Sequence, residues 1–323
     1  MMFETLSEPS PVLLALILSA CSDYEYTEIG LTEVFHQPKV SESADVLFII
    51  DNSGSMEEEQ ARLATNFDAF VLVLSESYAD FQLGVTTTDV GDGGALHGEV
   101  YTRDSTDLED TFQATVMVGT SGSKDERGFQ SALLALDLNP TFTRDNARLN
   151  LVFLSDEDDH SPDLVEVYLQ EFRSRAGTGG LLVHGIVGDQ PFGCAAGGTA
   201  ANAGVRYIQA IKTVGGYRDS ICAEDYSDVL SRIGLQVVGL NDTFLLNDLP
   251  EPQSIEVWVD RVTMPNRQAD GWTYEPGENA IVFHGRSIPR PGMEIFVKYL
   301  PLMGGGNQQE ASDPPADSAD TGS

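Results

Sequence analysis

The chain has 323 residues, of which 41% are hydrophobic, so it can bury a full core and has room for a second, smaller domain. Its 18 basic and 51 acidic residues give a formal net charge of -33, which disfavours binding to nucleic acid or to an anionic membrane surface. Divalent cations and basic partners are better candidates, although the same acidity also suits solubility or a salty exterior.

The first residues predict an export signal. An apolar run over 12–18 is too short to span a bilayer, and the Leu-Ser-Ala-Cys sequence that ends at Cys21 resembles the cleavage box of bacterial lipoproteins. We therefore expect 1–21 to be a lipoprotein signal peptide and Cys21 to carry a lipid. The segment departs from the usual pattern because it contains Glu4 and Glu8 but no Lys or Arg. The alternative is a buried apolar helix with an incidental cysteine.

Strands and helices are predicted to alternate over 45–240. Residues 22–44 are polar and mixed, and we expect them to form a tether with a short ordered approach to the first strand. The apolar stretch 45–50 predicts a strand buried on both faces. Further strands are expected at 81–88, 149–154 and 181–187, and helices around 63–74, 126–138, from 162, at 205–214 and at 226–238. Residues 106–118 are expected to form a helix and a short extended piece. This order predicts an α/β fold with a doubly wound, mostly parallel sheet.

The pattern of apolar and polar residues changes after Leu240. Residues 254–260 and 293–299 alternate apolar and polar side chains, and the short runs between them are punctuated by Pro and Gly. We expect a small antiparallel, sandwich-like β domain at 243–300. The acidic tail 301–323 is expected to be disordered.

Two cysteines remain if Cys21 is lipidated. Cys194 and Cys222 form an even pair in an oxidising compartment, so a disulfide between them is expected. Their separation excludes a CxxC redox or zinc motif. The alternative is a pair of buried free thiols.

The loop after the 45–50 strand carries the main candidate site. Asp51, Ser53 and Ser55 alternate along it, and open parallel sheets bind ligands at this end of their strands. The pattern resembles the metal-ion-dependent adhesion site of von Willebrand factor A domains, and the resemblance covers about 45–240. A competing interpretation is a capping box, because Glu58 lies three residues after Ser55.

A second carboxylate is expected beside this loop. Asp156 follows another predicted core strand, and parallel neighbouring strands bring their ends together. Two acids at one sheet edge repel each other unless a cation lies between them, so Asp51 and Asp156 together call for a metal ion. Asp158 and Asp159, together with Asp89 after the 81–88 strand, form either a second cation site or a solvated acidic rim.

The resemblance also implies a ligand set. In von Willebrand A domains the two serines bind the ion directly, the two aspartates act largely through water, and a threonine from a middle loop completes the shell. Thr120 lies in the corresponding loop, but spacing back from Gly128 places Asp125 there, with Ser121 and Ser123 as further candidates. The expected ion is Mg²⁺, and an added carboxylate shifts the preference toward Mn²⁺ or Ca²⁺.

Serine ligands also indicate a type of function. Hydroxyls leave the ion with net positive charge and an exchangeable position, so it can bind an acidic side chain of a protein or peptide partner. We expect a non-enzymatic adhesion protein of the bacterial cell envelope that contacts the membrane only through its lipid anchor. The alternatives are a metal-assisted hydrolase that uses the acidic run 156–159 and a structural envelope protein with a stabilising ion.

Overall fold

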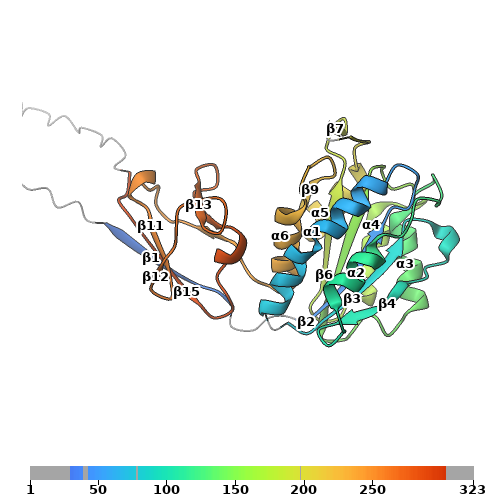
Figure 1. Cartoon of the computed structure of the whole chain (residues 1–323), viewed down its shortest axis with the longest axis horizontal. Coiled ribbons are helices and arrows are strands. Elements are labelled where there is room, and N and C mark those ends of the chain that lie inside the picture. The colour runs from blue at the N-terminus through green and yellow to red at the C-terminus, as the bar shows by residue number, and fades with distance from the viewer. Residues whose placement is uncertain (1–29, 39–42, 78, 197, 303–323) are drawn as a thin grey trace, which may run out of the picture.

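The computed structural model describes residues 30–38, 43–77, 79–196 and 198–302 (Figure 1). The predicted signal peptide with Cys21 and nearly all of the predicted acidic tail lie outside these residues. Among the helices in the described part, none is both long and apolar enough to cross a membrane. The described chain forms an α/β unit and a smaller β unit (Figure 1).

A six-stranded sheet lies at the centre of the α/β unit, with the strand order β4-β3-β2-β5-β6-β9. All neighbours pair in parallel except β4, which is antiparallel to β3. The strands are β2 (Ser43–Ile50), β3 (Phe81–Thr87), β4 (His97–Thr102), β5 (Ala147–Ser155), β6 (Leu181–Val187) and β9 (Arg218–Ser220). This confirms the predicted mostly parallel α/β sheet. The sequence does not predict the edge strands β4 and β9, because they are largely exposed and their residues are mostly polar.

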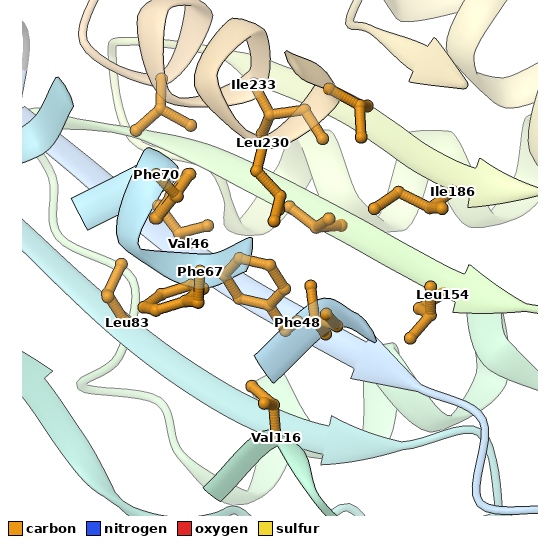
Figure 2. Packing of buried hydrophobic residues seen from close by; sticks show 14 of the residues in the cluster. Val46, Phe48, Phe67, Phe70, Leu83, Val116, Leu154, Ile186, Leu230 and Ile233 are labelled. Atoms are coloured by element: carbon orange, nitrogen blue, oxygen red, sulfur yellow. The ribbon is translucent and has the colours of Figure 1, made fainter. Parts of the chain in front are cut away.

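Helices cover both faces of this sheet. One face carries α1 (Glu57–Ser77), α2 (Leu108–Val116) and α6 (Ser227–Val237), and the other carries α3 (Gly128–Leu138), α4 (Val165–Arg175) and α5 (Val205–Val214). Alternate residues of β2 enter the two cores: Phe48 packs with Phe67 and Phe70 of α1 (Figure 2), whereas Leu47 and Ile49 face α3 to α5. Burial of both faces explains why β2 is a continuous apolar run.

The smaller unit consists of two antiparallel sheets with the strand orders β1-β15-β11-β12 and β10-β14-β13. Side chains such as Val257, Ile281 and Val297 from both sheets share one core. The strands are β1 (Leu31–His36), β10 (Thr243–Leu245), β11 (Glu256–Val259), β12 (Val262–Thr263), β13 (Trp272–Glu275), β14 (Ala280–Phe283) and β15 (Glu294–Tyr299).

The predicted tether at 22–44 is wrong for part of its length. Residues 31–36 form the edge strand β1, which pairs antiparallel with all of β15, and β2 already begins at Ser43. The side chains of β1 alternate between half-buried and exposed, and no side chain of the strand is fully buried. Such a strand has no apolar run, so its composition resembles that of a linker.

Because β1 precedes the α/β unit and β10 follows it, the chain passes between the two units twice. The buried Gln37 joins these passages: its Nε2 donates to the carbonyls of Asn241 at 2.5 Å and Pro289 at 3.0 Å, and its Oε1 accepts from the Asn241 amide at 3.1 Å. Arg290 and Glu76 form an ion pair across the junction at 3.1 Å. A cleft of about 830 Å³ lies here between α1, α6 and the segment 283–291, away from the C-terminal end of β2.

Candidate metal centre

The site lies at the topological switch point of the sheet, between the neighbouring parallel strands β2 and β5. The chain leaves β2 toward β3 on one side, and it leaves β5 toward β6 on the other. The C-terminal ends of two such neighbouring strands form the crevice in which open α/β sheets bind ligands. Ile50 pairs with Leu154, and the Asp51 amide donates to the Leu154 carbonyl at 2.9 Å. Asp51 and the Ser155–Asp156 pair therefore emerge side by side.

Hydroxyls connect the carboxylates of this crevice. Asp51 is fully buried, and its Oδ1 accepts from the Ser53 amide at 2.8 Å while its Oδ2 accepts from Ser155 Oγ at 2.8 Å. The Ser53 and Ser55 hydroxyls lie 3.3 Å apart, and the Ser55 side chain lies close enough to Asp156 to oppose the rise in the pKa of that acid. The structure thus brings together Asp51, Ser53, Ser55 and Asp156, the residues expected from the motif. The Ser55 side of the group is exposed to solvent.

The middle loop contributes a residue that the sequence does not predict. Asp125 is exposed and pairs with Arg127 Nη2 at 2.5 Å, and the Thr120 hydroxyl makes no hydrogen bond within the described part of the chain. Glu126 is only 2% exposed, and its carboxylate lies close enough to Ser53 for that side chain to oppose the rise in its pKa. The loop therefore places Glu126, and not Asp125, on its buried side. The loop has no periodicity and contains several oxygen donors, so counting back from Gly128 could not fix which side chain turns inward.

Buried polar contacts fix the middle loop against the sheet. Gln60 of α1 donates through Nε2 to the carbonyls of Asp51 at 2.9 Å and Gly119 at 2.8 Å, and its Oε1 accepts from the Gly119 amide at 3.2 Å. The Gly122 amide donates to the Asn52 carbonyl at 2.8 Å. These bonds attach the loop to the residues that follow β2, so both parts of the site are held by one framework.

The pKa values of the three acids show that they crowd one another. Burial, followed by the charges of Asp51, Glu157 and Asp156, raises the pKa of Glu126 to about 8. Burial and the charge of Asp51 raise the pKa of Asp156 to about 6, although its hydrogen bond from Ser55 opposes the change. Burial also raises the pKa of Asp51. Acids in this arrangement ionise together most readily beside a cation.

The donor atoms fit a hard divalent cation. Glu126 Oε2 and Asp156 Oδ1 are buried carboxylate oxygens without a hydrogen-bond partner in the described residues. In the same part of the chain, no group of three or more His, Cys, Asp or Glu side chains is placed to hold an ion. A set of carboxylates and hydroxyls suits Mg²⁺, Mn²⁺ or Ca²⁺ rather than a softer metal.

The acidic residues after Asp156 have structural partners. Asp159 is buried, and its Oδ1 accepts from the Phe129 amide at the start of α3 at 3.0 Å while its Oδ2 pairs with Arg206 Nε at 2.9 Å. Asp158 Oδ1 accepts from the Arg206 amide at 2.9 Å. The structure therefore assigns these two side chains to helix and loop contacts, rather than to a second cation site or a solvated rim.

A hairpin made of β7 (Cys194–Ala196) and β8 (Thr199–Ala201) lies beside the site. Cys194 forms a disulfide with Cys222, which attaches the hairpin to the chain after β9. The Thr199 hydroxyl donates to the buried Glu59 of α1. Asn202 donates to Glu157 at 2.6 Å through its side chain and to the Asp156 carbonyl at 2.8 Å through its amide. The hairpin therefore supports the loops that carry the site.

Neither known family models nor curated protein sequences match this chain. Distant matches exist among solved structures. The pilus adhesin SpaC from Lactobacillus rhamnosus GG is 11% identical with a TM-score of 0.48, and the match covers 84% of this chain and 41% of that chain. A von Willebrand factor type A protein from Catenulispora acidiphila is 13% identical with a TM-score of 0.37, over 85% and 66% of the two chains. This chain thus spans less than half the length of the SpaC chain.

Proposed function

We propose that this protein is an adhesion protein of the bacterial cell envelope whose α/β unit binds a protein or peptide partner through a divalent cation. The observation that carries the proposal is the hydroxyl-linked carboxylate group at the ends of β2 and β5, with two buried carboxylate oxygens that lack a partner among the described residues. The proposed ligands of the ion are Asp51, Ser53, Ser55 and Asp156.

The residues of the site explain why binding is favoured over catalysis. The hydroxyls of Ser53 and Ser55 are neutral, so they neutralise none of the ion's charge. Ser55 is exposed, and the site is therefore reachable from the solvent. A bound cation supplies a positive charge that attracts an acidic side chain of a partner. Asp51, hydrogen-bonded to Ser53 and Ser155, orients the loop that presents the serines.

The test is metal-dependent capture of a partner. Immobilised protein is incubated with solubilised cell-envelope proteins in Mg²⁺ or in chelator, and Ser53→Ala is compared with Ser75→Ala, an exposed serine near the other end of α1. We expect wild type and Ser75→Ala to retain a partner in Mg²⁺ alone, and Ser53→Ala to lose it. Capture that neither chelator nor Ser53→Ala reduces would contradict the proposal. Metal-dependent thermal stability without any metal-dependent capture would support a structural ion instead.

Anchoring through Cys21 is a separate part of this proposal and rests on the sequence before the described residues. Metabolic labelling with a palmitate analogue tests it directly. We expect the wild-type protein to be labelled and Cys21→Ser to remain unlabelled. Equal labelling of both would exclude the lipid anchor at this residue.

A further inference from the structure

We infer that the segment 190–205, which contains the β7–β8 hairpin, is a docking surface for a protein partner whose own contact surface has an apolar centre and a basic rim. The segment has no Asp, Glu, Lys or Arg, although 21% of the residues in the whole chain are charged. The hairpin projects from the upper edge of the α/β unit in Figure 1. The inference goes beyond the proposed function, because this contact needs no cation.

The centre of this surface is apolar and exposed. Phe192 is 93% exposed, the largest fraction among the exposed large hydrophobic side chains of the described residues. Pro191, Ala195, Ala196 and Ala200 of the same segment are also exposed. Single apolar residues are common on protein surfaces and need no explanation. An aromatic ring within a stretch that lacks charge instead matches the centre of a protein interface, where charged residues are depleted and aromatic residues are enriched.

The hairpin holds Phe192 on a rigid support. Cys194 is bonded to Cys222, and β7 pairs with β8. At Gly193 a Cβ atom would lie 2.0 Å from the Ala201 carbonyl oxygen, so the backbone next to Phe192 packs directly against the other strand of the hairpin. A side chain on such a support loses less conformational entropy when a partner binds than a side chain on a flexible loop. The support therefore favours Phe192 as an anchor.

Acidic side chains border the surface. A Cβ atom at Gly198 would lie 2.8 Å from Glu58 Oε2, so the exposed Glu58 of α1 adjoins the hairpin. Glu224 and Asp225 are exposed and follow Cys222, which the disulfide attaches to the hairpin. These acids attract Lys and Arg on the rim of a partner and repel Asp and Glu. They also disfavour a second copy of this chain as the occupant, because two identical acidic rims would face each other.

A random-peptide phage library tests the chemistry of the partner. The whole protein is immobilised in chelator, which removes any contribution of a cation, and the enriched peptides are sequenced and synthesised. We expect these peptides to combine apolar residues with Lys or Arg. Phe192→Ala should lower the affinity for such a peptide by about tenfold or more, because it removes the aromatic anchor. Val262→Ala, at a 65% exposed position of β12 in the β unit, should leave the affinity unchanged.

Charge variants test the acidic rim separately. Glu58→Gln combined with Glu224→Gln should weaken peptide binding by about twofold to fivefold at low salt, and added salt should reduce this difference. Thermal unfolding provides the control for folding. Phe192→Ala should unfold at the wild-type temperature, because the side chain that it removes is almost fully exposed.

Three results would overturn the docking surface: equal peptide affinities of wild type and Phe192→Ala, enriched peptides that lack apolar and basic residues, or no enriched peptide. Self-association in sedimentation that Phe192→Ala abolishes would assign the surface to a second copy and overturn the basic partner. Because the selection is carried out in chelator, none of these results bears on the metal site. Failure of Mg²⁺-dependent capture would likewise leave this surface intact.

Discussion

At the scale of single residues, Glu126 makes the stability of the metal-free protein depend on pH. Its pKa is 4.5 in the unfolded chain and about 8 in the folded protein. Between these values the folded state keeps a proton that the unfolded state has lost. The stabilisation is complete below 4.5, and it is lost as the pH rises toward about 8. The slope is at most about 1.4 kcal/mol per pH unit for one group.

Urea unfolding in chelator across this pH range measures the effect. We expect the free energy of unfolding of wild type to fall as the pH rises and Glu126→Gln to show a smaller fall. Mn²⁺ should reverse the trend, because the ion favours the ionised acid. A wild-type curve that matches the Glu126→Gln curve at every pH would rule out the raised pKa.

The sequence predicts the site residues unequally, for a physical reason. Asp51 and Asp156 follow buried apolar strands, so their place at the sheet edge can be read from the pattern. The hydroxyls of Ser53 and Ser55 alternate in a short loop and point to a common side. Glu126 lies in a long loop whose conformation depends on two tertiary hydrogen bonds, one donated by Gln60 to the Gly119 carbonyl and one donated by the Gly122 amide to the Asn52 carbonyl. A local sequence pattern does not reveal such tertiary hydrogen bonds.

At the scale of elements, the disulfide-linked hairpin is expected to stabilise both the fold and the site. Cys194 and Cys222 are 28 residues apart, and closing a loop of this size contributes about 3.5 kcal/mol in the loop-entropy account. The double variant Cys194→Ser/Cys222→Ser should lose a comparable free energy of unfolding. It should also bind Mn²⁺ more weakly, because Thr199 and Asn202 of the hairpin region contact Glu59 and Glu157.

Urea unfolding and calorimetry of the double variant test both effects. Wild type treated with a reductant provides a second way to open the same bond. Loss of stability without any loss of Mn²⁺ affinity would show that the hairpin does not support the site. Unchanged stability would contradict the role of the bond in the fold.

The start of α3 depends on Asp159. Its side chain accepts from the Phe129 amide and pairs with the partly exposed Arg206, so Asp159→Ala leaves the Phe129 amide and Arg206 Nε without their partner. We expect a loss of about 3 kcal/mol in the free energy of unfolding, at the lower end of the range for broken buried pairs. Asp158→Ala, which loses one bond to the Arg206 amide, should cost less. Equal losses in urea unfolding would contradict this assignment.

At the scale of the whole molecule, the β unit is built from both ends of the described chain. The aromatic rings of Phe35 in β1 and Phe244 in β10 lie 5.5 Å apart. Phe35→Ala should destabilise the β unit by about 1 to 2 kcal/mol, because the side chain is only half-buried. Val34→Ala, at an exposed position of the same strand, should have little effect.

Thermal unfolding with Mn²⁺ present separates the two units. We expect Phe35→Ala to lower the midpoint temperature of the unfolding transition of the β unit, which does not change with Mn²⁺. The variant should leave the Mn²⁺ affinity of the α/β unit unchanged. If these residues formed only a tether, neither Phe35→Ala nor Val34→Ala would lower the unfolding temperature of the β unit, and this result would contradict the role of β1.

The central sheet and the β unit were predictable to different degrees. Strands covered on both faces, such as β2 and β5, are long apolar runs and are evident in the sequence. β1 pairs with a strand more than 250 residues away, and its half-buried side chains form no apolar run. The insertion of the α/β unit between β1 and β10 is therefore visible only in the folded chain.

Calorimetric titration of wild type, Asp51→Ala and Ser53→Ala with Mn²⁺ tests the central claim most directly. Asp51→Asn and Ser75→Ala serve as a conservative variant and a distant control. The account predicts saturable binding of one ion to wild type and to Ser75→Ala, with a loss of about 100-fold in Asp51→Ala and Ser53→Ala. Mn²⁺ affinities that are equal in wild type, Asp51→Ala and Ser53→Ala would contradict the metal site at the ends of β2 and β5.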